Sequence, residues 1–195
     1  MNGLQVMDFE SFVKQATILA QGLINSPAPN DIEYLNNLDE MLKRVIDIPK
    51  TNPKNSTIKK GGDGWNWSTV VDSMPIYGIQ LNMTAGSSLP AHDHRGYIGL
   101  VHVLDGQVKV ASYDQESAVS DDLVLSKISE KILNPGESTF VPLKSANIHT
   151  IQDVAGGSTL LDLLTIFSGN GDSYEIEIKN QLGDHYQASF TGSKI

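Results

Sequence analysis

The chain has 195 residues, of which 39% are hydrophobic and 19% charged, a balance typical of one globular domain. Its formal net charge of -9 gives a surface that repels phosphate backbones and anionic lipid, which argues against nucleic-acid and membrane partners. Cysteine is absent, which excludes disulfides, thiolate metal sites and a cysteine nucleophile and agrees with a reducing cytosol. No secretory signal or apolar membrane span is evident, so we expect a cytoplasmic protein.

Helical periodicity dominates the first fifty residues. Apolar side chains recur every three or four residues between positions 9 and 23, and Asp8 precedes them as an N-cap. A second stripe runs from Ile32 to Ile46, and Asn30 followed by Glu33 resembles a capping box. We therefore expect an N-terminal helical segment that packs on the rest of the chain.

A loop and then a series of short strands follow the helices. Residues 49–67 are rich in Pro, Gly, Asn and Lys, which is typical of a loop. From about Trp67 onward the period changes to two. Strand candidates lie near 79–83, 101–110, 123–128, 138–141, 148–151, 159–167 and 174–178, with turn signals between them. This pattern predicts an antiparallel sandwich or barrel over 65–195, joined in a single domain by helices within 1–50.

The pair His92 and His94 lies in an extended segment of this β region. Residues two apart in a strand share a face, so both imidazoles can point to one place inside a barrel. His149 follows a Pro-Gly turn and a strand, and it is the natural third ligand of a metal ion. Three histidines would occupy one face of an octahedron and leave positions open for substrate and dioxygen.

The remaining candidates have both structural and functional interpretations. His102 lies in an apolar run and favours a buried structural role, whereas His185 lies in a polar tail and favours exposure to solvent. Arg95 beside the histidine pair could meet a substrate carboxylate or be a solvated surface residue. Aromatic residues that could pack in the barrel or line the mouth of a substrate pocket are Trp65, Trp67, Tyr77 and Tyr97.

These motifs resemble the cupin pattern, in which a glycine precedes the histidine pair, Gly106 closes the hairpin and a later strand supplies a third histidine. The general pattern has a glutamate seven residues before the closing glycine, but Gly99 stands there. A site of three histidines alone is the mark of thiol dioxygenases in that superfamily. The sequence resembles in particular the cysteamine dioxygenase and plant cysteine oxidase family, through residues 89–96 (LPAHDHRG), 104–114 (LDGQVKVASYD), 147–149 (NIH) and 161–164 (LDLL).

This resemblance implies a mainly β protein, a cupin double-stranded β-helix (jelly-roll) barrel with an N-terminal helical segment. It further implies an Fe(II) enzyme that uses O2 to convert a small aminothiol or an N-terminal cysteine to its sulfinic acid. His92, His94 and His149 would hold the iron, with Ni or Zn as other metals in the purified protein. Asp162 matches the family's functional aspartate and would bind the substrate amine or shape the substrate pocket. The alternative is that Asp162 is a loop or edge carboxylate without a function.

The sequence also departs from the family. Arg95 replaces a proline, no tyrosine follows Asp162 at the family's spacing, and a C-T-Y motif has no counterpart. Two alternatives therefore stay open: another oxygenase, of the diketone-cleaving type, or a cupin that binds a small ligand or uses its metal structurally. A structural site is usually closed by a fourth protein ligand, and none lies nearby in the sequence, which favours a reactive site.

Overall fold

The computed structural model describes residues 6–49, 59–60, 63–119, 122–168 and 171–195. Two helices, α1 (Phe9–Ile24) and α2 (Asp31–Leu42), come first. The strands that follow are β1 (Lys59–Lys60), β2 (Trp65–Ser73), β3 (Ile76–Thr84), β4 (Ser88–His92), β5 (Tyr97–Asp105), β6 (Val108–Val119), β7 (Asp122–Leu133), β8 (Ser138–Val141), β9 (Ile148–Asp153), β10 (Gly157–Ile166), β11 (Tyr174–Leu182) and β12 (His185–Lys194).

Both helices begin at the predicted caps. The Asp8 carboxylate accepts a hydrogen bond from the Ser11 backbone N–H at 2.7 Å. The Asn30 side-chain oxygen accepts one from the Glu33 N–H at 3.1 Å, while its amide donates to the Glu33 carboxylate. Since side-chain oxygens satisfy N–H groups that have no partner inside the helix, these caps fix where each helix starts.

The second apolar stripe was predicted too long. Helix α2 ends at Leu42, and Ile32 and Ile46, the two ends of the predicted stripe, are 46% and 71% exposed. The buried face is instead formed by Tyr34, Leu35, Leu38, Asp39, Met41 and Leu42.

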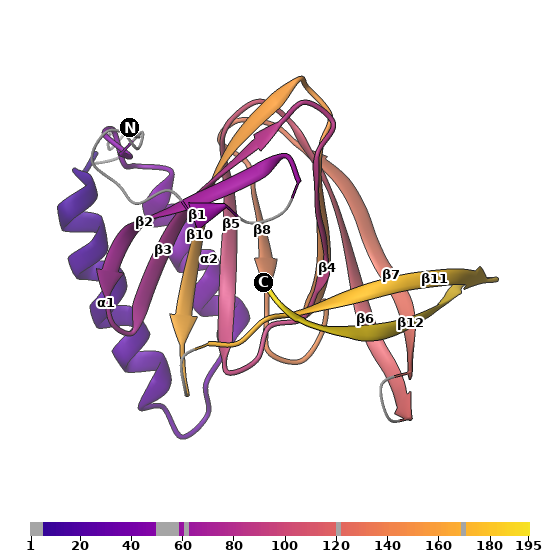
Figure 1. Cartoon of the computed structure of the whole chain (residues 1–195). Helices are drawn as coiled ribbons and strands as arrows, with labels where there is room; N and C mark the ends of the chain where they lie inside the picture. The colour runs from indigo at the N-terminus through magenta and orange to yellow at the C-terminus, as the bar shows by residue number, and fades with distance from the viewer. Residues whose placement is uncertain (1–5, 50–58, 61–62, 120–121, 169–170) are drawn as a thin grey trace.

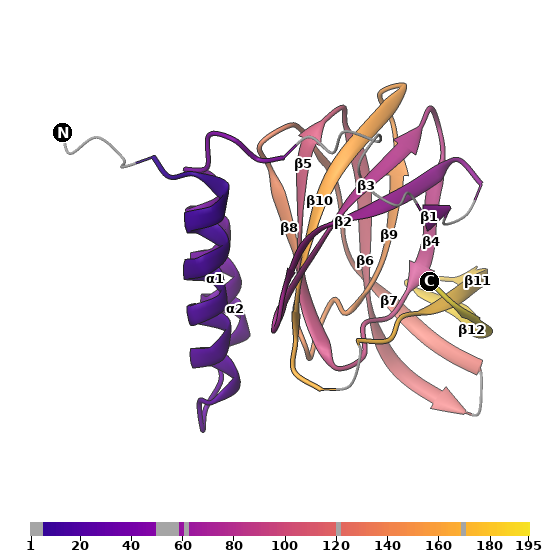
Figure 2. The same ribbon diagram turned by 60° about the vertical axis from the view of Figure 1, so that its left-hand side comes forward.

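The helices form a layer against the outer face of one sheet (Figures 1 and 2). Apolar residues of α1 and α2 share one core cluster with Leu100 of β5 and with Leu161 and Leu163 of β10. Polar contacts also join the layers, and in one of them the Tyr34 hydroxyl lies 2.6 Å from the Thr165 hydroxyl, with both residues buried. Strand β10 therefore turns alternate residues toward the helices and toward the barrel interior.

The strands form two sheets that enclose the barrel core. The first has the order β1-β2-β3-β10-β5-β8, and the second the order β11-β12-β7-β6-β9-β4, closed because β11 pairs with both β12 and β4. Val101 and Leu160 of the first sheet pack with Val108 and Ile151 of the second in one cluster. The predicted fold, a mainly β cupin jelly roll with helices before it, is confirmed.

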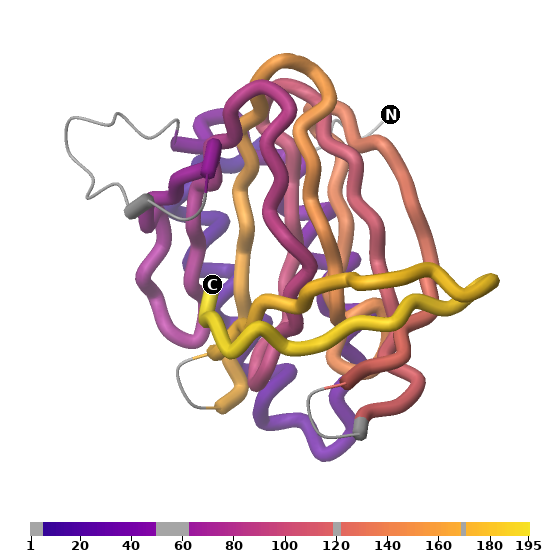
Figure 3. The backbone as a smooth tube through the Cα atoms, turned by 45° about the vertical axis from the view of Figure 1, so that its right-hand side comes forward, coloured from indigo at the N-terminus to yellow at the C-terminus, as the bar shows by residue number. Residues whose placement is uncertain are grey.

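Two regions differ from the sequence prediction. β12 was not predicted, because its residues were interpreted as a polar tail. It instead pairs with β7 and β11, and the β11–β12 hairpin forms part of the second sheet (Figure 3). Residues 50–58 and 61–62 of the predicted loop lie outside the described residues, and β2 already begins at Trp65. In the described part of the chain, neither helix has the length and apolar character needed to cross a bilayer.

Candidate metal centre

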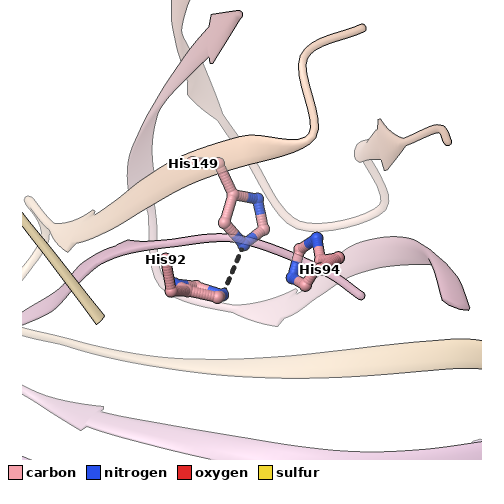
Figure 4. Close-up of side chains that lie close together, drawn as sticks. All are labelled: His92, His94 and His149. Carbon is pink, nitrogen blue, oxygen red and sulfur yellow. Dashed lines mark hydrogen bonds between the residues drawn. The ribbon is translucent and has the colours of Figure 1, made fainter. Parts of the chain in front are cut away.

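The three predicted ligands converge inside the barrel (Figure 4). His92 ends β4, His94 follows two residues later, and His149 lies in β9, directly opposite His92 in the β4–β9 register. Their side chains are almost fully buried, and the Nε2 atoms of His92 and His149 are 3.0 Å apart. The ring centroids of His94 lie 4.9 Å from His92 and 4.8 Å from His149.

The hydrogen bonds of His92 fix which of its nitrogens can bind a metal ion. Its Nδ1–H donates to the Pro90 carbonyl at 2.9 Å, which leaves the Nε2 lone pair directed at the cluster. Such a bond at the distal nitrogen sets the tautomer and orientation of a metal-binding imidazole. The Nδ1 atoms of His94 and His149 are buried and make no hydrogen bond within the described part of the chain.

Electrostatics keeps all three rings neutral near pH 7. Burial lowers the pKa of His92, and burial together with the neighbouring histidines lowers the pKa of His94 and His149 well below the usual value. Neutral imidazole is the form that binds metal. Two nitrogens at right angles around an ion, each about 2.1 Å from it, are about 3.0 Å apart. The 3.0 Å separation of the His92 and His149 nitrogens therefore fits adjacent ligands of one octahedral ion.

A cavity of about 190 Å³ opens beside His92 and His94. Trp65, Trp67 and Tyr77, which the sequence left between a core and a pocket role, line it. Among the described residues of its lining, Asp162 is the one acidic side chain, and none is lysine or arginine. The remaining lining residues are Ile79, Leu81, Leu89, Tyr97, Leu164, Ile166, Gly171, Ser173 and Ile195.

Asp162 lies on the face of β10 that borders the cavity. Burial raises the pKa of its carboxyl group from the usual 3.8 to about 7. No other described residue forms a hydrogen bond or ion pair with it, although part of its surface borders the cavity. A buried carboxylate without a partner is costly, so this group is suited to a ligand that brings a positive charge.

Gly99 occupies the position where the general cupin pattern has a glutamate, and it lies next to Asp162. A Cβ atom at this position would lie 3.4 Å from a Leu164 methyl group and 3.6 Å from Asp162 Oδ1. Both are ordinary van der Waals contacts, so Gly99 lies directly beside the Asp162 carboxylate without a clash that would require a glycine. Within the described residues, the group able to hold a metal contains His92, His94 and His149 and no fourth ligand.

The structure places Tyr97 in the cavity and Arg95 outside it. The Tyr97 ring lies 4.8 Å from the ring of His94, and its hydroxyl hydrogen-bonds the hydroxyl of Ser173. The sequence analysis did not single out Ser173, because a lone serine before a strand carries no recognisable signal. Arg95 is absent from the lining; its guanidinium lies over the rings of Tyr174 and Phe190.

Neither of the other histidines joins the cluster. His102 is buried on the helix side of the first sheet, where its Nδ1 lies 2.8 Å from the Ser138 hydroxyl, which donates to Asp39 of α2. His185 is half exposed and lies 3.1 Å from the Glu116 carboxylate. Both positions agree with the structural and solvent-exposed roles that the sequence favoured.

Comparison with protein families gives a match to the model PCO_ADO, the plant cysteine oxidase and cysteamine dioxygenase family, over residues 73–166. This confirms the resemblance predicted from the sequence. The matched segment contains His92, His94, His149 and Asp162, and it ends before Ser173. No curated protein sequence matches the chain significantly.

Solved structures resemble the chain only distantly. KdgF from Halomonas sp. is 15% identical with a TM-score of 0.46, and the match covers 58% of this chain and 91% of KdgF. An RmlC-like cupin from Shewanella frigidimarina is 17% identical with a TM-score of 0.46, covering 60% and 88% of the two chains. The 7S globulin of Momordica charantia is 9% identical with a TM-score of 0.49, covering 63% and 36%. The PCO_ADO match, rather than these structures, therefore bears on function.

Proposed function

We propose that the protein is a non-haem Fe(II) thiol dioxygenase that oxidises a small aminothiol or an N-terminal cysteine to the sulfinic acid. In this reaction R–SH and O2 give R–SO2H: the O–O bond breaks, two S–O bonds form, and the electrons that sulfur loses reduce the oxygen. The observation that carries the proposal is the convergence of three buried neutral histidines beside a cavity with one unpartnered carboxylate.

His92, His94 and His149 would hold the metal. Iron bound there supplies the redox chemistry between thiol and dioxygen, for which protein side chains have no equivalent. The three ligands are uncharged, so the centre keeps the full positive charge of the ion and favours a substrate that binds as a thiolate. Within the described residues no fourth ligand closes the site, as a structural metal site would require.

Asp162 would select substrates that carry an amine. An ammonium group beside its carboxylate forms a charge-assisted hydrogen bond and favours the ionised form, which burial alone disfavours. A substrate carboxylate would find no lysine or arginine among the described lining residues and would be repelled by Asp162. We therefore expect cysteamine to be preferred over free cysteine. A peptide with an N-terminal cysteine should also be preferred, because the carboxyl group of that cysteine forms an uncharged peptide bond.

The other lining residues would orient the substrate and exclude water. Trp65, Trp67 and Tyr77 provide aromatic walls that can pack against the carbon chain or the ammonium of an aminothiol. Tyr97 is held between the His94 ring and the Ser173 hydroxyl, so its own hydroxyl has a fixed position in the cavity. Burial raises the pKa of the Tyr97 hydroxyl further above its usual value, which keeps it protonated and able to donate.

The test is oxygen consumption after anaerobic loading with Fe(II), with cysteamine, free cysteine, 3-mercaptopropionate and an N-terminal-cysteine peptide as substrates. Mass spectrometry then asks whether the product gains both oxygen atoms. Activity should disappear in His149→Ala and persist in the matched control His185→Ala, which removes a half-exposed histidine. Stoichiometric iron binding without oxidation of any thiol would refute the proposal and favour a diketone-type oxygenase or a ligand-binding cupin.

A further inference from the structure

Asp93, the residue between His92 and His94, forms hydrogen bonds with the β11–β12 hairpin. Asp93 is buried, and its Oδ1 accepts a hydrogen bond from the Tyr174 backbone N–H at 2.8 Å. Its own N–H donates to the Tyr174 carbonyl at 3.2 Å. Because Asp93 lies between the ligands, any movement of this contact moves both imidazoles.

Arg95 completes the attachment. Its Nε donates to Asp93 Oδ2 at 2.6 Å, and its Cζ lies 4.3 Å from the ring centroid of Tyr174 and 4.8 Å from that of Phe190. Its backbone exchanges hydrogen bonds of 2.9 and 3.2 Å with Asp172. The guanidinium thus joins the ligand segment to both strands of the hairpin, through a charged hydrogen bond and through stacking on two rings.

The opposite side of the ligand segment is held by β9 and the turn before it. The His94 N–H donates to the Asn147 side-chain oxygen at 3.1 Å, and the Asn147 amide donates to the Pro142 carbonyl at 3.1 Å. His92 pairs with His149 across the strands. On the side away from β9, β4 pairs with β11 as far as His92, and Asp93 and Arg95 extend this attachment past His92 to the residue after His94.

We propose that Arg95, acting through Asp93, is a positioning residue that holds His92 and His94 in the geometry required for metal binding. The inference rests on the metal centre of the proposed function, but not on the identity of the thiol. It also assigns a role to the hairpin, which lies beyond the segment that matches PCO_ADO. In metal sites, contacts behind the ligands typically change affinity or activity about 10- to 100-fold.

If Arg95 acted through its charge alone, replacing it would strengthen metal binding, whereas a positioning role predicts weaker binding. The two explanations can therefore be distinguished by experiment. Arg95 follows His94 directly, so replacing it with a neutral residue removes a cation beside a cation-binding site and leaves the Asp93 carboxylate uncompensated. Both changes would strengthen metal binding through electrostatic attraction alone. A positioning role predicts weaker binding in the same variant.

The experiment measures the dissociation constant of Co(II), from its visible absorption, for the wild type and for Arg95→Met, Arg95→Lys and Phe190→Leu. We expect about 10- to 100-fold weaker binding in Arg95→Met. The loss in Arg95→Lys should be smaller, because lysine keeps the charge but cannot lie flat on the rings. Phe190→Leu should weaken binding in the same direction. The control Lys14→Met removes a cation from an exposed ion pair on α1 and should leave binding unchanged.

The outcomes separate this inference from the metal site itself. If the wild type does not bind Co(II), the metal centre fails. If the wild type binds and the folded Arg95 and Phe190 variants bind equally well or more tightly, only the positioning role is overturned. Circular dichroism of the metal-free proteins identifies the folded variants, and Arg95→Lys and Phe190→Leu decide the question alone if Arg95→Met does not fold.

Discussion

Replacing Asp162 with asparagine should change how the stability of the metal-free protein depends on pH. Burial raises the pKa of this carboxyl group to about 7 in the folded chain, against 3.8 for the ordinary group that the unfolded chain presents. Below the lower value the group is protonated in both states. Between the two values the unfolded chain releases the proton and the folded chain retains it, so the free energy of unfolding falls as pH rises.

The magnitude follows from the two pKa values. One tenfold difference in proton affinity corresponds to about 1.4 kcal/mol, so the whole effect is about 4 kcal/mol. Between about pH 5 and about pH 8 the carboxyl group should lower wild-type stability by about 2.5 kcal/mol. The amide that Asp162→Asn introduces has a similar shape and no charge at any pH, so this contribution disappears in the variant.

Urea unfolding, followed by the fluorescence of Trp65 and Trp67 at the cavity, measures both proteins at each pH. All other titrating groups are shared, so the difference between the variant and the wild type isolates Asp162. We expect the variant to gain stability relative to the wild type by about 2.5 kcal/mol from about pH 5 to about pH 8. A difference that stays constant across this range would refute the assignment of a raised pKa to a buried, unpartnered carboxyl group.

Three further predictions test the fold, each by urea unfolding. Leu38→Ala should cost about 2–5 kcal/mol, because Leu38 is fully buried between α2 and the first sheet; a loss below about 1 kcal/mol would contradict that packing. Gly106→Ala should lower the free energy of unfolding more than Gly136→Ala does. Both glycines have positive φ, but of the two only Gly106 lies where a Cβ atom would clash with backbone, so equal losses would contradict this reasoning. Tyr97→Phe should cost about 1–3 kcal/mol, because the buried Ser173 hydroxyl loses its partner; equal stability would show that this bond contributes nothing.

Two of the candidate metal ligands could be paired from the sequence because strand alternation is local, whereas His149, 57 residues from His92, was inferred from the turn and strand before it. His92 and His94 share a face by strand alternation, and His149 follows a turn that sets the next strand. The helix starts at Asp8 and Asn30 were equally local, since each cap bonds an N–H three residues along. The fold class followed from the spacing of strands and turns.

Features that depend on distant pairing could not be predicted in this way. Arg95 was interpreted as a possible substrate contact, because nothing near it in the sequence indicates that Tyr174 and Phe190 stack on its guanidinium. Strand β12 is half exposed and mixes polar residues on both faces, so it lacks the alternation that identifies a strand. The end of α2 was missed because apolar residues continue to Ile46 after the helix has stopped.

Strand β10 serves two layers of the molecule at once. Leu163 and Thr165 face the helices, and Thr165 is tied to Tyr34, whereas Asp162 and Leu164 between and beside them border the cavity. Neighbouring residues of a strand cannot move independently, because close packing transmits a displacement along the backbone. If the proposed function is correct, substitutions under the helices should alter the affinity for the proposed amine-bearing substrate as well as the stability. The helical layer would then be a place where selectivity can be changed without altering any group that touches the substrate.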